Sequence, residues 1–152
     1  MDNHMFLSWN SVVGDDDLVL HLGDVTLLSR PSKCARLAEQ LQTLKGHKIL
    51  LRGNHDRREM LKAYRKWGWI VLSSLSVGDT LFTHRPVFPV NKQFKVNIHG
   101  HCHGTHPSTE VHIDVGVDAL RIYEPVEARH FVSLETCYQI ALLYRMRAQN
   151  GK

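Results

Sequence analysis

Side chains that commonly bind metals stand directly after several short apolar segments of this sequence. Asp24 follows the run from Leu18 to Leu22, and Asn54-His55-Asp56 follows the run from Lys48 to Arg52. Imidazoles take the same place after two later apolar runs: His84, His101 and His103. One carboxylate, one carboxamide oxygen and three imidazoles form a mixed donor set, which suits Mn, Fe, Zn or Ni better than Ca or Mg. The pattern predicts a site for a divalent transition metal.

The segments around these side chains predict alternating strands and helices. Short apolar runs indicate strands, and apolar residues at helical spacing indicate helices. We expect strands at residues 18–22, 48–52, 69–72, 80–83, 95–98 and 111–115, and helices at 5–13, 57–66, 133–148 and from Ser32, the expected N-cap, to Gly46. Strand–helix–strand units followed by a strand-rich second half imply a layered α/β sandwich. Because ligands bind at the carboxyl ends of strands in open α/β sheets, the donors should converge there.

The length and composition fit a globular protein with a polar site. At 152 residues we expect one domain over residues 1–152, and 43% hydrophobic with 22% charged residues excludes a disordered chain. The net charge of +4 is compatible with an anionic substrate but is a weak indicator. The chain has 11 histidines, and five of them fall between His99 and His112. This local excess of imidazole predicts a site before any motif is considered.

Cysteine usage and the N-terminus favour a cytoplasmic location. Cys34, Cys102 and Cys137 are an odd number at wide spacings, which fits reduced thiols better than a disulfide framework. No apolar run approaches the roughly 18–20 residues that span a membrane, so we expect no membrane partner. The first residues have neither the basic start nor the apolar core of a signal peptide.

Four motifs in order resemble those of calcineurin-like metallophosphoesterases: Gly23-Asp24, Gly53-Asn54-His55-Asp56, Thr83-His84 and Gly100-His101-Cys102-His103. Each alone is weak or moderately specific, but all four in order, each at a strand end, are a strong indication. The resemblance is to small bacterial and phage members and covers about residues 1–127, with His112 to Asp118 and Pro125-Val126 as the closing strands. It implies a four-layer αββα sandwich, with two sheets flanked by helices.

The resemblance also implies a ligand set. Asp24 would bridge two metals, and Asn54, His84 and His101 would complete the shell of the second metal. His103 would bind the first metal. Two metals about 3.5–4 Å apart activate a water and clamp phosphate oxygens. The implied reaction is hydrolysis of a phosphomonoester or phosphodiester by metal-activated water, with manganese among the expected cofactors and a nucleotide or nucleic acid among the expected substrates.

Other residues have implied roles in catalysis and substrate binding. His55 would protonate the leaving oxygen or hold a phosphate oxygen, and Asp56 would orient its ring, because a carboxylate on the far nitrogen fixes the tautomer. Asn54 and Arg85 are the expected substrate contacts, although a solvated arginine is an equal alternative for Arg85.

The chain departs from the family pattern at its N-terminus. Family members begin with a strand ending in Asp-x-His, which supplies two ligands of the first metal. Asp2-Asn3-His4 matches these letters, but no apolar strand leads into it, and we interpret it as a coincidence. We therefore expect an N-terminally truncated domain that holds one metal in place of two. Its Leu18 to Leu22 strand would be an exposed edge, and exposed edges favour a homodimer.

Other interpretations assign the same residues different roles. A truncated site could make the chain a catalytically weak or inactive module that binds metal or phosphate. Asp24 could be a turn residue, and Asn54 and Asp56 could cap a helix. His101-Cys102-His103 could form a small structural zinc site with His99 or His106, although the second pair of ligands at typical spacing is missing. In the enzyme interpretation, Cys102 points away from the metals and packs in the interior.

Overall fold

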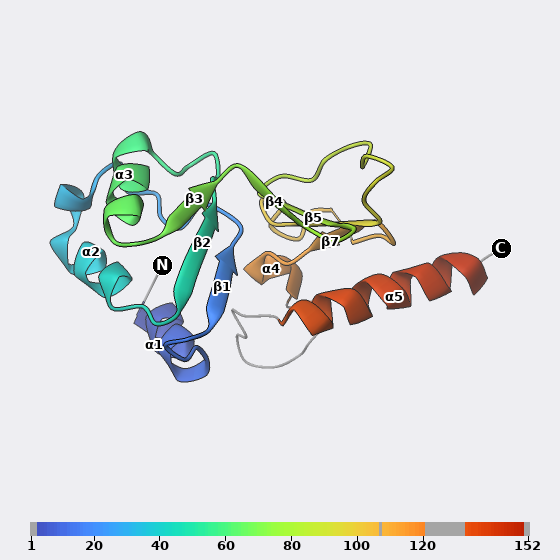
Figure 1. Cartoon of the computed structure of the whole chain (residues 1–152), viewed down its shortest axis with the longest axis horizontal. Helices are drawn as coiled ribbons and strands as arrows, with labels where there is room; N and C mark the ends of the chain where they lie inside the picture. The colour runs from blue at the N-terminus through green and yellow to red at the C-terminus, as the bar shows by residue number, and fades with distance from the viewer. Residues whose placement is uncertain (1–2, 107, 121–132, 151–152) are drawn as a thin grey trace. The chain divides into compact units, whose positions relative to one another are not determined.

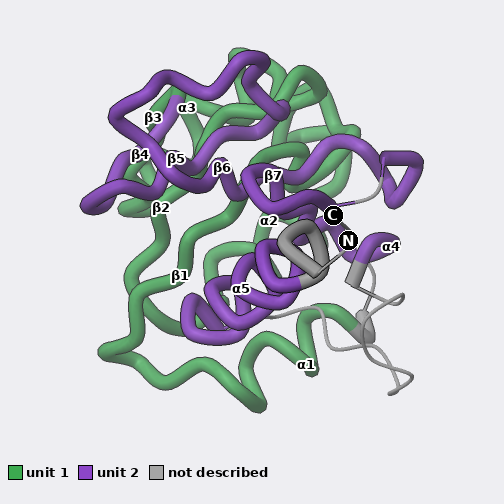
Figure 2. The backbone as a smooth tube through the Cα atoms, turned by 90° about the vertical axis from the view of Figure 1, so that its right-hand side faces the viewer, with its two compact units in different colours: residues 1–73 green, residues 74–152 purple. Residues whose placement is uncertain are grey.

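A computed structural model describes residues 3–106, 108–120 and 133–150. The chain forms two compact units, residues 1–73 and 74–152, coloured separately in Figure 2. Each unit contains one β-sheet with helices, so the α/β class with two sheets is confirmed. That residues 1–152 act as one domain stays a prediction. Asp2 and Pro125-Val126, which figured in the sequence analysis, lie outside the described residues.

Unit 1 is a parallel sheet with helical connections (Figure 1). Its elements are α1 (Asn3–Val12), β1 (Leu18–His21), the 3-10 helix η1 (Pro31–Lys33), α2 (Ala35–Gln42), β2 (His47–Leu51), α3 (Arg58–Lys66) and β3 (Ile70–Leu72). The strand order is β1-β2-β3, and both pairs are parallel because a helix separates successive strands. The helix expected from Ser32 to Gly46 is wrong at both ends, since α2 ends at Gln42 with Thr43 as its C-cap. Pro31 to Lys33 form a separate 3-10 turn, so α2 starts at Ala35 and Cys34, not Ser32, occupies its N-cap position.

Aromatic rings fill the interior of unit 1. Tyr64 on α3 stacks on Trp69 with ring centroids 5.0 Å apart, and Trp9 on α1 lies 6.4 Å from Trp69. The Trp9 Nε1–H group donates to the carbonyl of Lys45 at 3.0 Å, which fixes α1 to the segment before β2. Trp9 and Trp69 are buried, as expected of core residues rather than of a base-stacking surface.

Unit 2 contains a mixed sheet with the order β4-β5-β6-β7. Its elements are β4 (Ser74–Val77), β5 (Thr80–Thr83), β6 (Val96–His99), β7 (His112–Asp114), α4 (Val117–Leu120) and α5 (Leu134–Asn150). β4 is antiparallel to β5, and the other pairs are parallel. The sequence analysis did not predict β4 or α4. β4 is short and largely exposed, with alternating serines, and the four residues of α4 are too few to show helical periodicity.

The centre of unit 2 is β6, whose four residues are all buried. Helix α5 packs against β7, and the hydroxyls of Thr80 and Tyr138 are 2.9 Å apart, which joins β5 to α5. The helix expected at residues 133–148 is therefore confirmed. Within the described segments, no helix is both long enough and apolar enough to cross a bilayer.

Strand β1 forms one edge of the described sheet of unit 1, where β2 is its single partner strand. Leu18, at the start of β1, is 68% exposed. Unpaired strand edges recruit other chains. We propose that two copies of the chain associate through this edge, so that the sedimentation coefficient rises with protein concentration.

Leu18→Lys should weaken this association, because a charge at a strand edge opposes pairing, and it should leave the fold intact at this exposed site. Leu7→Lys, at an exposed position of helix α1, is the matched control and should leave association unchanged. Sedimentation that is independent of concentration in the unmodified chain would contradict the prediction.

Candidate metal centre

In unit 1, the loops after β1 and β2 carry Asp24 and the segment 53–56, and the side chain of Asp56 ties these loops together. Asp56 is 3% exposed. Its carboxylate accepts the backbone N–H groups of Asp24 at 2.8 Å, Val25 at 3.1 Å and Gly53 at 2.8 Å. A buried carboxylate is costly unless it is hydrogen-bonded, and these amides satisfy it. Asp56 is therefore a clamp between two loops that carry predicted site residues.

The loops are also joined in the opposite direction. Oδ1 of Asp24 accepts the backbone N–H of His55 at 2.7 Å. Asp24 adopts φ of 56°, a left-handed conformation that non-glycine residues rarely occupy. The Asp56 clamp holds the N–H of Asp24 itself, so it stabilises this conformation directly.

Gly53 is required by the close approach of the Asp24 loop. A Cβ atom at position 53 would clash with the carboxylate and the backbone N of Asp24. Only glycine allows two backbone segments to approach so closely without displacing the carboxylate. The glycine of this motif thus has a steric function in placing Asp24.

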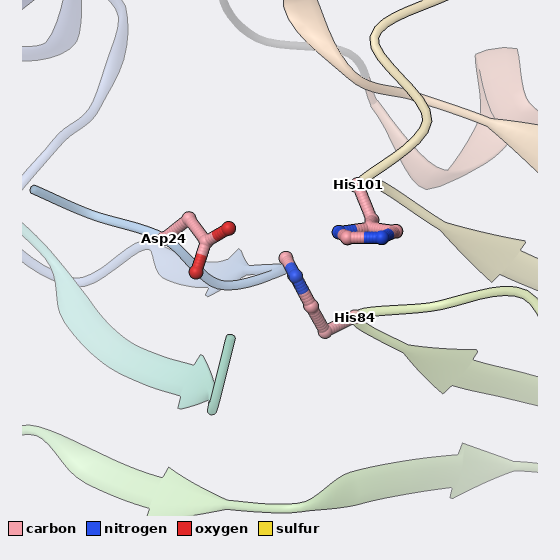
Figure 3. Close-up of side chains that lie close together, drawn as sticks. All are labelled: Asp24, His84 and His101. Atoms are coloured by element: carbon pink, nitrogen blue, oxygen red, sulfur yellow. The ribbon is translucent and has the colours of Figure 1, made fainter. Parts of the chain in front are cut away.

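In unit 2, the ends of β5 and β6 bring His84 and His101 together. Their ring centroids are 4.9 Å apart at an interplanar angle of 64°, and ring nitrogens of the two lie within 4.8 Å (Figure 3). His84 is buried and His101 is half-buried. The carbonyl of His84 accepts the N–H of Gly100 at 3.1 Å, so the loop before His101 is anchored on the backbone of His84. Two imidazoles in this arrangement can share one metal ion.

Asn97 holds the loop that follows His84, and the sequence analysis did not identify it. Its side chain is fully buried, and its amide donates to the carbonyl of Leu81 at 3.1 Å and to Oγ1 of Thr83 at 2.9 Å. Its Oδ1 accepts the N–H of Val87 at 2.9 Å. The available signal was an asparagine between Val96 and Ile98 in an apolar strand, because a buried amide there must bond to its surroundings.

Left-handed backbone coincides with predicted metal ligands. Within residues 3–106, 108–120 and 133–150, the non-glycine residues with positive φ are Asp24 at 56°, His101 at 69° and His103 at 49°. Such conformations cost of order 1–3 kcal/mol each and persist where the surrounding structure enforces them, often at functional sites. All three belong to the predicted ligand set.

The remaining predicted residues lie at the surface. Asn54, His55, Arg85 and His103 are exposed. Nδ1 of His103 is 3.1 Å from Oδ2 of Asp118. That Asp56 orients the ring of His55 stays a prediction, since the described bonds of its carboxylate go to backbone amides.

Burial shifts the pKa values of Tyr64 in unit 1 and of Cys102 and His99 in unit 2. Burial, and then the charge of Asp56, raises the pKa of the Tyr64 phenol, which therefore stays neutral. Burial, and then Asp114, raises the pKa of the Cys102 thiol, while burial lowers the pKa of His99. Cys102 is buried, as expected, and its sulfur lies with His99 and Asp114. Cys102 is not among the predicted ligands of the catalytic metal. The carboxylate and imidazole donors of those ligands fit a divalent transition metal.

The steric role of Gly53 gives a direct test. Gly53→Ala should displace the carboxylate of Asp24 and lower Mn²⁺ affinity by about 10–100-fold, the usual effect of disturbing the support of a ligand. Titration calorimetry with Mn²⁺ measures this. Gly14→Ala is the matched control, because a Cβ there meets only ordinary contacts. Equal affinity in both variants would contradict the role of Gly53.

If Asp56 holds the two loops together, replacing it should lower the stability of the fold. Asp56→Asn replaces one acceptor oxygen by a donor that faces backbone N–H groups, so the free energy of unfolding in urea should fall by about 2–3 kcal/mol. Asp79→Asn removes a solvent-exposed ion pair with Lys95 and should change the free energy far less. Indistinguishable unfolding curves for Asp56→Asn and the unmodified chain would rule out the clamp.

Comparison with known proteins shows the family of the chain. A family model described as calcineurin-like phosphoesterase matches residues 5–125. An uncharacterized protein of Methanocaldococcus jannaschii is 31% identical over 112 residues, which are 70% of this chain and 55% of that protein. The chain thus spans about half the length of this curated relative. A crystal structure of a protein of unknown function from Aquifex aeolicus has a TM-score of 0.57 and 20% identity, covering 77% of this chain and 76% of that chain, and shows a shared fold.

The family match includes every predicted site residue, from Asp24 in unit 1 to His103 in unit 2. The motifs that carried the resemblance therefore lie within the matched range. The chain belongs to the calcineurin-like phosphoesterase family, whose members are hydrolases that bind divalent metals.

Proposed function

We propose that this chain hydrolyses a phosphomonoester or phosphodiester with a divalent transition metal, held by Asp24, Asn54, His84 and His101. Membership of the family supports the reaction class. The observation that carries the assignment to these loops is the left-handed backbone of Asp24, His101 and His103. Among the described non-glycine residues, this conformation falls on predicted ligands alone, which indicates loops shaped for binding rather than for folding alone.

Within each unit, backbone contacts fix the donors that would hold the metal. The Asp56 clamp and Gly53 fix the position of Asp24, and the His84–Gly100 backbone bond fixes the loop of His101. When bound, the metal supplies Lewis-acid polarisation of a phosphate oxygen and lowers the pKa of a water. The chain would supply the side chains that hold this metal.

His55 and Arg85 act on the substrate in this proposal. The backbone N–H of His55 is bonded to Oδ1 of Asp24, so its exposed ring is tied to the same loop as the central carboxylate. This placement suits a group that delivers a proton to the leaving oxygen. The guanidinium of Arg85, on the exposed loop after His84, would hold a phosphate oxygen.

We propose one tightly held metal, with Mn, Fe, Zn and Ni as the suitable ions. His103 is the additional donor for a second ion, and its contact with Asp118 leaves Nε2 as the nitrogen that would bind. His4 of the Asp2-Asn3-His4 sequence lies in α1, which begins two residues before the helix expected at 5–13. A nucleotide or nucleic acid is the substrate class to examine first, together with phosphorylated proteins.

The alternative is a module that binds metal or phosphate without turnover. The two functions differ in whether a bound metal is accompanied by hydrolysis. An aryl phosphate monoester and a diester serve as general substrates. Hydrolysis should vanish with chelator and return with Mn²⁺ if the chain is an enzyme. Mn²⁺ binding without hydrolysis of either ester would favour the binding module, and full activity in chelator would contradict the metal mechanism.

A second experiment separates the proton donor from the ligands. His55→Gln should leave Mn²⁺ affinity unchanged and slow hydrolysis by about 10²–10⁴-fold, the usual contribution of a general acid. His47→Gln, at an exposed position at the start of β2, is the matched control and should change neither quantity. Loss of Mn²⁺ binding in His55→Gln would show that His55 is a ligand.

A further inference from the structure

Unit 2 contains a second group of potential ligands, separate from the proposed catalytic set. One ligand atom each from His99, Cys102 and Asp114 lie within 4.8 Å of one another. Bound to a tetrahedral ion at about 2.0–2.3 Å, such atoms would be roughly 3.5 Å apart, which small side-chain rotations can reach. None of these residues belongs to the ligand set proposed for hydrolysis.

The fold places the three side chains together. His99 ends β6 and is in register with Asp114 at the end of β7, so the two residues are direct neighbours in the sheet. Cys102 lies in the tight turn after β6, where its N–H donates to the carbonyl of Gly100 at 2.8 Å and its carbonyl accepts the N–H of Thr105 at 2.9 Å. The arrangement therefore depends on backbone structure and not on three flexible side chains.

All three side chains are buried, with exposed fractions of 3% for His99, 9% for Cys102 and 1% for Asp114. Asp114 accepts the N–H groups of Gly116 at 2.8 Å and Gly104 at 3.4 Å. Among the described residues no Lys or Arg forms an ion pair with it. With two amide donors, one of them at 3.4 Å, Asp114 is less well satisfied than Asp56, and a bound cation would neutralise its buried charge.

The surroundings of the donors match those of metal ligands. Nδ1 of His99 is 2.9 Å from the carbonyl of Gly100, and because a carbonyl can only accept, Nδ1 carries the proton. The lone pair is then on Nε2. Metal-binding histidines usually donate their other N–H to a backbone carbonyl or carboxylate in this way, and ligating carboxylates are themselves hydrogen-bonded. His99 and Asp114 have both features.

We propose that His99, Cys102 and Asp114 bind a structural Zn²⁺ ion. A thiolate, an imidazole and a carboxylate are the donor types that Zn²⁺ accepts, and the fourth position would be taken by water. The ion would tie the turn of residues 100–104, which carries His101 and His103, to the end of β7. It would thus support the loop whose left-handed residues are proposed catalytic ligands.

Co²⁺ substitution tests this site separately from the catalytic one. Thiolate coordination gives a near-ultraviolet charge-transfer band, which the oxygen and nitrogen donors of the catalytic set do not produce. Added Co²⁺ should give this band with a stoichiometry of one per chain, and Zn²⁺ should abolish it by competition. His84→Ala, in the catalytic set, should retain the band.

Variants assign the band to its ligands. The chain has three cysteines, so the double variant Cys34→Ser/Cys137→Ala keeps only Cys102 and should retain the band. Cys102→Ser should lose the band. Asp114→Asn should weaken Co²⁺ binding by at least about ten-fold, because even the loss of a residue that only supports a ligand has an effect of this size. Should Cys102→Ser fail to fold, the double variant still decides the assignment. Absence of the band from the folded, Co²⁺-saturated chain or from the double variant, or its persistence in Cys102→Ser, would overturn the proposal.

Discussion

The carboxylate of Asp56 connects the loops after β1 and β2 by accepting three backbone N–H groups. Hydrogen bonds to a charged acceptor are worth about 1.5–3 kcal/mol each, more than a bond between neutral groups. These hydrogen bonds stabilise a left-handed backbone conformation at Asp24, which a non-glycine residue does not prefer on its own. The position of Asp24 therefore depends on a side chain that follows it by 32 residues.

In unit 2, the loops that carry site residues are anchored by a side-chain amide and by a backbone hydrogen bond. Asn97, fully buried in β6, fixes the loop after His84, and Gly100 bonds to the carbonyl of His84. Both units thus place the exposed or half-buried site residues on loops whose anchors are buried. Buried polar groups with all their partners make such loops rigid, and rigid loops keep donors close to binding geometry without a ligand. The proposed Zn²⁺ site at Cys102 would add a third anchor of this kind.

The sequence predicted the features that repeat along the chain or stand at strand ends. Short apolar runs located β1, β2, β5 and β6, and helical spacing located the long α5. The motifs located Asp24, His84 and His101 at strand ends. It did not predict β4 or α4, because four residues with alternating serines or a single helical turn show no clear period.

The sequence also did not reveal which polar residues act as anchors. Asp56 was expected to orient a catalytic ring, and Asn97 was not noticed. Their bonds join residues distant in sequence, such as Asp24 with Asp56 and Asn97 with Val87. Local patterns do not encode such pairings, which depend on how strands come together in three dimensions. The grouping of Cys102 with Asp114 was not predicted for the same reason, because it depends on the pairing of β6 with β7.

The central proposal is that Asp24 and His84 bind the same metal ion. A double-mutant cycle of Mn²⁺ affinity, with Asp24→Ala, His84→Ala and the double variant, tests it most directly. If both side chains bind one ion, the two losses should be non-additive by about 1 kcal/mol or more. Losses that add within about 0.3–0.5 kcal/mol would show independent effects and contradict the account.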